Sequence, residues 1–233
     1  MRSPKAMPIS FVAFDMDGTL LDVASSWAEV HRYFGDRNTE ALQLFLDNKI
    51  DDQEFLRRDL ALWRRHRPHI SEADLVSSLA PVPLMPGAHE LFDALHARGI
   101  RTAIVSGGLD VIAQRIGREL GIDRVLANGF VLDGHGRLTD EGIIRVPIKR
   151  KGEVVAALQR EFGLSVDQCA AVGNSEIDVA MFERSRIGVA FLPEDDLVRR
   201  RATHVITEKD LRYVLAPLTE EDDRVPAGAR TPG

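Results

Sequence analysis

Short runs of apolar residues alternate along the chain with segments whose apolar positions recur every three or four residues. The runs end at polar or glycine-rich loops, which is typical of buried strands, and the segments between them are typical of amphipathic helices. The predicted strands cover residues 9–14, 101–105, 170–172 and 187–191. This alternation predicts an α/β fold with a central parallel sheet and helices on both faces. Ligands of such sheets bind beyond the carboxyl ends of the strands, so function is expected in the loops there.

Two stretches depart from this alternation. Residues 22–84 carry helical patterns but no convincing strand, which predicts a helical insert. Residues 125–138 alternate apolar and polar positions around Asp133-Gly134-His135-Gly136, which predicts a small hairpin. We therefore expect residues 1–21 and 85–218 to form the core of the fold, with residues 22–84 as a separate helical unit.

Composition narrows the range of partners. The 233 residues include 30 Lys and Arg against 36 Asp and Glu, a net charge of −6, so counterion release offers little affinity for nucleic acid. The single cysteine, Cys169, cannot form an internal disulfide, and no window approaches the about 18 apolar residues of a membrane span. We expect a cytoplasmic protein that binds neither nucleic acid nor membrane. Residues 219–233 are acidic, then rich in Pro and Gly, and are expected to be disordered.

An acidic pair follows the first predicted strand. Asp15 and Asp17 are two positions apart, so both carboxylates can lean toward one side of the loop. Such a pair suits Mg²⁺, which binds one or two carboxylates and leaves its other positions to water and phosphate. The same Asp-x-Asp-Gly pattern also occurs in turns and calcium loops, so the pair by itself leaves both interpretations open.

Three further loops carry groups that bind anions or metals. Ser106-Gly107-Gly108 follows a strand and precedes a helix, so its hydroxyl and backbone N–H groups can hold an anion. Lys151-Gly152 opens a predicted helix and supplies a positive charge suited to a phosphate oxygen. The segment from Gly173 to Asp178 adds oxygen ligands after a third strand. None of these motifs is specific alone, but their order and placement together indicate a phosphate site.

In this combination the chain resembles the haloacid dehalogenase superfamily of phosphohydrolases. The four motifs are Asp15 to Leu20, Ser106-Gly107-Gly108, Lys151-Gly152 and Gly173 to Asp178, and the resemblance covers residues 9 to about 215. It is strongest to the phosphoserine phosphatase-like branch, in which a small helical cap is inserted just after the first motif. The resemblance implies a Rossmann-like core with such a cap, which suits the helical insert predicted here.

The resemblance also implies a reaction. Asp15 would be the nucleophile that forms an aspartyl-phosphate, and Asp17 the general acid and base. Ser106, Gly107 and Lys151 would bind the phosphoryl group of a small phosphorylated metabolite. Mg²⁺ would bind Asp15, Asp17 and the fourth motif, where the candidate ligands are Asn174 and Asp178. The implied activity is that of a Mg²⁺-dependent phosphatase, acting as a monomer or homodimer.

The sequence departs from the family at two places. The family usually has an aspartate where this chain has Asn174, so metal affinity is expected to fall unless Asp178 compensates. Phosphoserine phosphatases carry a glutamate and a cap arginine for the amino acid, where an ungapped comparison places Ala24 and Leu60. A small gap would bring in Arg57 or Arg58 at the second place, but nothing replaces the glutamate. A small phosphomonoester other than phosphoserine is therefore the preferred substrate.

Two polar residues of the insert are candidates for substrate binding. His31 and Asp59 each lie beside an apolar helical stripe, where they either contact the substrate or are hydrogen-bonded within the insert. Other functions also remain open. Phosphoserine phosphatase proper, a phosphotransferase or phosphomutase with the same aspartyl-phosphate, and a non-catalytic binding protein of the same fold are the alternatives.

Overall fold

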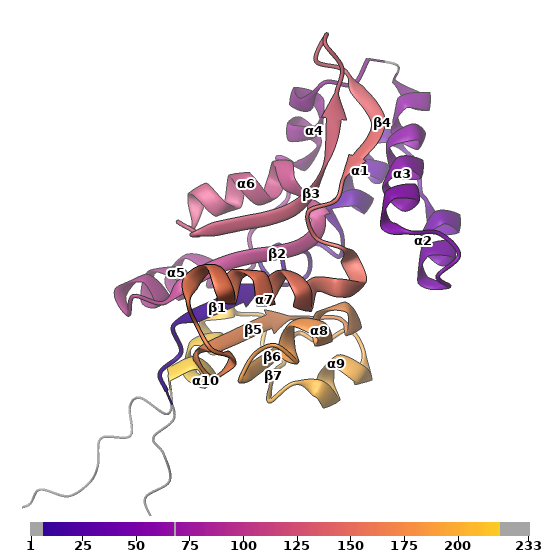
Figure 1. Cartoon of the computed structure of the whole chain (residues 1–233). Helices are drawn as coiled ribbons and strands as arrows, with labels where there is room; N and C mark the ends of the chain where they lie inside the picture. Colours follow the sequence, from indigo (N-terminus) through magenta and orange to yellow (C-terminus); the bar gives the residue numbers. More distant parts are fainter. Residues whose placement is uncertain (1–6, 68, 220–233) are drawn as a thin grey trace, which may run out of the picture.

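The computed structural model describes residues 7–67 and 69–219, which form a seven-stranded sheet in the order β4-β3-β2-β1-β5-β6-β7 (Figure 1). Every neighbouring pair is parallel except β3 and β4. The predicted α/β class is thus confirmed. The strands are β1 (Phe11–Phe14), β2 (Arg101–Leu109), β3 (Arg124–Leu132), β4 (Leu138–Ile143), β5 (Cys169–Gly173), β6 (Ile187–Phe191) and β7 (His204–Ile206).

Helices cover both faces of the sheet, as predicted. Val12 and Phe14 of β1 belong to one buried apolar cluster, and Phe11 and Ala13 belong to a second, because alternate side chains of a strand point to opposite faces. The first cluster includes residues of α5 and α6, and the second includes residues of α7, α8 and α9. The helices of the core are α5 (Ala88–Ala97), α6 (Asp110–Glu119), α7 (Lys151–Phe162), α8 (Val179–Phe182), α9 (Asp196–Arg201) and α10 (Leu215–Thr219).

The strand order places a crevice beside β1. From β1 the chain first builds β2 and β3 on one side and later builds β5, β6 and β7 on the other. Adjacent connections therefore diverge between β1 and β5, which is where ligands of open α/β sheets bind. The loops after β1 and β5 and the end of β2 meet at this point.

Residues 22–84, called the cap segment below, form four helices: α1 (Ser26–Phe34), α2 (Thr39–Leu46), α3 (Asp52–His66) and α4 (Glu72–Leu79). The segment leaves and re-enters the core at one place, where Leu21 and Leu84 form an isolated bridge and Met85 N donates to Leu20 O at 2.8 Å. That the segment is a domain of its own stays a prediction, as do its exact boundaries.

The predicted hairpin is present, but it joins the sheet to the cap segment. β3 and β4 flank a turn in which Asp133 Oδ1 accepts hydrogen bonds from the backbone N–H groups of His135 and Arg137. α3 packs along β4, with Gln53 Nε2 donating to Gly142 O at 3.0 Å (Figure 1). The hairpin thus forms part of the support for α3.

Several boundaries differ from those expected. β2 continues beyond residue 105 to Leu109, with a shift of register against β3 between Val105 and Leu109. The short edge strand β7 was not predicted, because three residues carry too little pattern. The sequence predicts disorder for residues 219–233. Thr219 is instead the last residue of α10, and residues 220–233 lie outside the described part of the chain. Within residues 7–67 and 69–219, no helix is long and apolar enough to cross a bilayer.

Candidate active site

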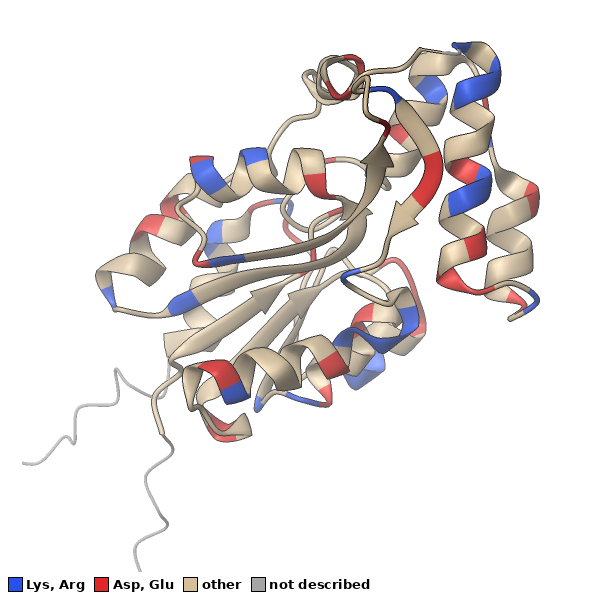
Figure 2. Ribbon diagram, turned by 45° about the horizontal axis from the view of Figure 1, so that its top comes forward, with Lys and Arg blue, Asp and Glu red and all other residues tan. Residues whose placement is uncertain are grey.

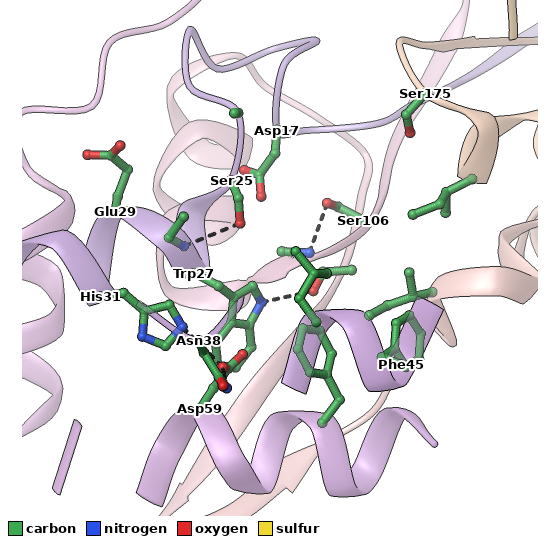
Figure 3. Close-up of a pocket in the computed structure, with 18 of the residues that line it drawn as sticks. Asp17, Ser25, Trp27, Glu29, His31, Asn38, Phe45, Asp59, Ser106 and Ser175 are labelled. Carbon is green, nitrogen blue, oxygen red and sulfur yellow. Dashed lines mark hydrogen bonds and ion pairs between the residues drawn. The ribbon is translucent and has the colours of Figure 1, made fainter. Parts of the chain in front are cut away.

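One cavity of about 880 Å³ lies between the carboxyl ends of the central strands and the cap segment. Asp15 follows β1, Ser106 lies in β2 and Asn174 follows β5, so three adjacent strands deliver these residues to it. Figure 3 shows Asp17 and Ser106 on the core side, facing Trp27 and Asp59 of the cap segment. The strand order alone brings together motifs that are far apart in the sequence.

Lys151 bridges two buried carboxylates. Its Nζ lies 2.7 Å from Asp15 Oδ1 and 2.7 Å from Asp178 Oδ1, and all three side chains are less than 10% exposed. Burial and the charge of Asp178 raise the pKa of Asp15 to about 7, in spite of the opposing effect of Lys151. Burial alone would lower the pKa of Lys151, but the two carboxylates outweigh it and raise that pKa above its ordinary value. The ammonium group therefore stays charged in the site.

Asp178 is fully engaged by the protein. Its Oδ2 accepts hydrogen bonds from the backbone N–H groups of Asn174 (2.9 Å) and Ser175 (3.0 Å) and from the Ser175 hydroxyl, while its Oδ1 faces Lys151. The side chain is completely buried and is not among the residues that line the cavity. Asp178 thus orients Lys151 and the loop after β5.

Asp17 is held from one side only. Its Oδ2 accepts hydrogen bonds from the backbone N–H and the hydroxyl of Ser26, both at 2.8 Å, at the start of α1. Its Oδ1 is buried and has no hydrogen-bond partner among the described residues. Burial raises the pKa of Asp17. A carboxyl group with one free oxygen and a raised pKa is suited to exchanging a proton with a bound molecule.

The backbone at Gly108 leaves room for this arrangement. A Cβ at position 108 would lie 2.8 Å from Asp17 Oδ2, 2.8 Å from Ser26 Oγ and 2.5 Å from the terminal carbon of Met16. Ser26 Oγ also accepts a hydrogen bond from the backbone N–H of Leu109 at 3.0 Å. A single glycine thus permits the contact between β2, the loop after β1 and α1.

We expect Gly108→Ala to lower the free energy of unfolding by about 1–3 kcal/mol, because the methyl group overpacks a site with no space around it. Urea denaturation measures the change. Gly134→Ala is the matched control, since a Cβ there meets nothing within 4 Å, and its effect is expected to stay within about 0.5 kcal/mol. Equal effects of the two substitutions would contradict the packing argument.

Ser106 and Gly107 present polar groups to the cavity. The Ser106 hydroxyl accepts a hydrogen bond from the backbone N–H of Gly108 at 3.0 Å, which orients it, and the residue is 2% exposed. The carbonyl of Gly107 accepts a hydrogen bond from Trp27 Nε1 at 3.0 Å (Figure 3). The Ser106-Gly107-Gly108 segment of β2 is thus tied directly to the cap segment.

Asn174 contacts a carboxylate that sequence analysis missed. Its Nδ2 donates to Glu194 Oε1 at 2.9 Å, and its Oδ1 lies 3.5 Å from the hydroxyl of Thr19. Loss of solvent around the carboxyl group, together with the charges of Asp178 and Asp195, raises the pKa of Glu194, although the residue as a whole is exposed. No sequence signal singled out Glu194, because it lies 20 positions beyond Asn174 in an ordinary loop.

The site offers oxygen donors for a hard cation. Within the described part of the chain, no three His, Cys, Asp or Glu side chains are grouped as a metal site. Asp15, Asp17 and Asn174 nevertheless line one cavity, where they offer carboxylate, amide and backbone carbonyl oxygens. Mg²⁺ needs only one or two protein carboxylates and keeps several waters, so this set fits it.

His31 and Asp59 are bonded to each other. His31 Nε2 lies 3.0 Å from Asp59 Oδ1, and Trp63 Nε1 donates to His31 Nδ1 at 2.8 Å. Because Nδ1 is an acceptor, the proton lies on Nε2 and is donated to Asp59. Asn38 also donates to Asp59 Oδ1. Both residues line the cavity while being hydrogen-bonded within the cap segment, so substrate contact by either stays a prediction.

The cap wall mixes apolar side chains with the charged residues Glu29, Arg32, Asp36 and Arg37. Ala24 lines the cavity, whereas Leu60 is completely buried in the core cluster. Arg57 and Arg58 both bind Glu54 and do not line the cavity. Arginines and acidic residues both occur along α3, where they appear as blue and red bands (Figure 2). The apolar side chains that line the cavity are Ala24, Trp27, Ala28, Leu42, Phe45, Leu46, Phe55, Ile148 and Ile177.

The fold and this set of strand-end residues define a hydrolase. The chain belongs to the haloacid dehalogenase-like hydrolase family, whose model matches residues 12–183. It is 32% identical over 213 residues to a phosphoserine phosphatase of Wolinella succinogenes, covering 90% of this chain and all of that one. The predicted family and the predicted phosphatase class are both confirmed.

Two solved structures share the fold. One is a phosphoserine phosphatase with a phospho-aspartyl intermediate analogue, at a TM-score of 0.75 and 24% identity, covering 90% of this chain and 98% of that one. The other is a HAD family hydrolase of Salmonella enterica, at a TM-score of 0.81 and 24% identity, covering 95% and 74%. The Rossmann-like core predicted from the resemblance is therefore confirmed.

Proposed function

We propose that this protein is a Mg²⁺-dependent phosphatase that hydrolyses a small phosphomonoester through an aspartyl-phosphate on Asp15. The observation that carries the proposal is the position of Asp15. Its carboxylate lies at the end of the central strand, 2.7 Å from a buried lysine, at the floor of a cavity that the cap segment covers. A carboxylate at such a place can attack a phosphoryl group that Lys151 and Ser106 hold.

The reaction has two displacements. In the first, a carboxylate oxygen of Asp15 forms a bond to phosphorus as the bond from phosphorus to the substrate oxygen breaks, and Asp17 gives its proton to the departing alkoxide. In the second, Asp17 takes a proton from water, whose oxygen attacks phosphorus and releases Asp15 and inorganic phosphate. The unpartnered oxygen and raised pKa of Asp17 support its role as acid and then base.

The remaining polar groups hold the phosphoryl group and the metal. The ammonium group of Lys151, the Ser106 hydroxyl and the backbone at Gly107 would bind phosphoryl oxygens. The residues that would hold Mg²⁺ are Asp15, Asp17 through its backbone carbonyl, and Asn174. When bound, Mg²⁺ neutralises negative charge on the phosphoryl group. The contacts of Asp178 support a positioning role for it in place of direct metal binding.

The walls of the cavity favour a substrate with an apolar skeleton. Ala24 stands at the position expected for the glutamate, and Arg57 and Arg58, nearest the position expected for the arginine, bind Glu54. Glu29, Arg32 and Arg37 are the residues of the cap segment that could still bind an amino acid at the cavity. Each CH₂ group buried against such walls contributes about 0.8 kcal/mol. His31 and Asp59 would then shape the wall. Phosphoserine stays the second candidate, because relatives at about 30% identity bear that name.

A phosphate-release screen tests this function. We expect kcat/KM for an alkyl or aryl phosphomonoester to exceed that for O-phosphoserine by at least about tenfold, since two buried CH₂ groups already supply that factor. EDTA is expected to abolish release, and added Mg²⁺ to restore it. Phosphate must appear as fast as substrate disappears; a slower appearance would indicate a phosphotransferase or phosphomutase. Binding of every monoester without release would indicate a non-catalytic binding protein.

The compartment in which this activity operates is expected to be the cytoplasm.

A further inference from the structure

Glu194 reaches back from the loop after β6 to the loop after β5. Its backbone N–H donates to the carbonyl of Asn174 at 2.8 Å, and its Oε1 accepts from Asn174 Nδ2 at 2.9 Å. The chain turns sharply just before it, at Leu192, whose φ of 45° is unusual for a residue with a branched side chain. Both contacts go to the same residue, so Glu194 and Asn174 form one unit at the edge of the cavity.

The charges of the cavity explain why such a unit matters. The carboxylate of Glu194 accepts its hydrogen bond from the neutral side-chain amide of Asn174. This contact does not neutralise the negative charge of Glu194. Asp15 and Asp178 already share the one charge of Lys151. A phosphomonoester adds a charge of about −1.5 to −2 at neutral pH. The site therefore has negative charge in excess and gains most from a divalent cation.

The hydrogen bond also decides which atom of Asn174 faces a cation. Because the NH₂ group points to Glu194, Oδ1 is the atom left to coordinate. A carboxylate that accepts from the NH₂ group polarises the amide and increases the negative charge on Oδ1. The amide and the carboxylate together then resemble a single anionic oxygen donor.

We propose that Glu194 is a positioning residue of the divalent-cation site, supplying through the amide of Asn174 the negative charge that this residue itself lacks. The inference rests on the proposed function, because it needs a cation beside Asp15. Glu194 would stabilise the bound cation in two ways: by polarising the amide of Asn174 and by direct electrostatic attraction at short range. Even with the dielectric constant of bulk water, about 80, one unit charge at about 6–7 Å changes the affinity for a divalent cation by roughly tenfold, so this is the smallest effect expected.

The test measures Mn²⁺ binding to the full chain without substrate, by calorimetry and by the electron paramagnetic resonance signal of free Mn²⁺. Glu194→Gln keeps an oxygen acceptor for Asn174 Nδ2 and removes only the charge, and we expect roughly tenfold weaker binding. The matched control is Glu176→Gln, the same change at an exposed residue of the loop after β5 that does not line the cavity; it is expected to bind within about twofold of the parent.

The double variant Asn174→Asp/Glu194→Gln separates charge from local structure. It moves the negative charge from position 194 to position 174, and we expect it to bind Mn²⁺ within about threefold of the parent chain. Thermal unfolding of all variants confirms that they are folded. Parent-like affinity of Glu194→Gln, or a double variant as weak as Glu194→Gln, would overturn the inference and leave the proposed function intact. A parent chain that binds no Mn²⁺ and releases phosphate in EDTA would overturn both.

Discussion

Replacing Asp15 by Asn is expected to lower kcat by at least about 10⁴-fold, because an amide cannot form the acyl phosphate and no other group at the site can take its place. The substitution preserves the shape of the side chain and leaves Lys151 paired with Asp178. Folding should therefore be retained, so the loss of turnover reports on chemistry. Steady-state phosphate release and thermal unfolding, measured side by side, give both values.

The control for this substitution is Asp22→Asn. Asp22 lies close in sequence, pairs with Lys209 at 2.7 Å and does not line the cavity, so its loss should change kcat less than about twofold. Brief reaction with ³²P-labelled substrate followed by acid quench should label the parent chain and not Asp15→Asn. Full activity in Asp15→Asn, or label on another side chain, would remove Asp15 as the nucleophile.

Lys151→Met is expected to lower the free energy of unfolding by about 3–5 kcal/mol at pH 8, because it leaves two carboxylates buried without their cation. The loss should be smaller at pH 5. Without the lysine, the pKa of Asp15, which already lies above its unfolded value, rises further, so protonation of Asp15 at low pH favours the folded state. That contribution disappears as the pH rises through the folded pKa. Urea denaturation at both pH values measures the difference.

Two further variants show whether the effect comes from this buried pair. Lys209→Met removes an exposed lysine from a surface ion pair and should cost less than about 1 kcal/mol at either pH. Asp178→Asn in the Lys151→Met background removes one of the two stranded carboxylates and should recover part of the lost stability at pH 8. A loss that is equal at pH 5 and pH 8, or no recovery in the double variant, would contradict the electrostatic explanation.

Much of the site could be predicted because it follows from strand ends. Asp15, Ser106 and Asn174 each follow or end an apolar run, and parallel strands deliver their carboxyl ends to one edge of a sheet. Lys151 was found for a similar reason, since it begins the helix that packs beside those ends. The sequence did not predict the C-terminal limit of β2 or the edge strand β7, because glycines and a three-residue strand carry little hydrophobic pattern.

The cap segment marks the limit of sequence reasoning. Its helical character is evident from the periodicity of apolar residues, but the pairing of His31 with Asp59, and of Trp63 with His31, depends on how α1 packs against α3. The amphipathic pattern places both polar residues near an apolar face without saying which group satisfies them. The contacts of Arg57 and Arg58 with Glu54 are local pairs within α3, but only tertiary packing shows that neither arginine lines the cavity.

By itself, the sequence determined the class of fold and the helical insert after the first motif. It also located the acidic, serine–glycine and lysine motifs that meet at the cavity. These features are local: hydrophobic periodicity and short motifs survive without knowledge of the rest of the chain. Tertiary structure alone decided that Asp178 orients Lys151 and that Glu194 lies against Asn174. Such contacts join loops of different strands, and their hydrogen bonds arise only when the sheet brings those loops together.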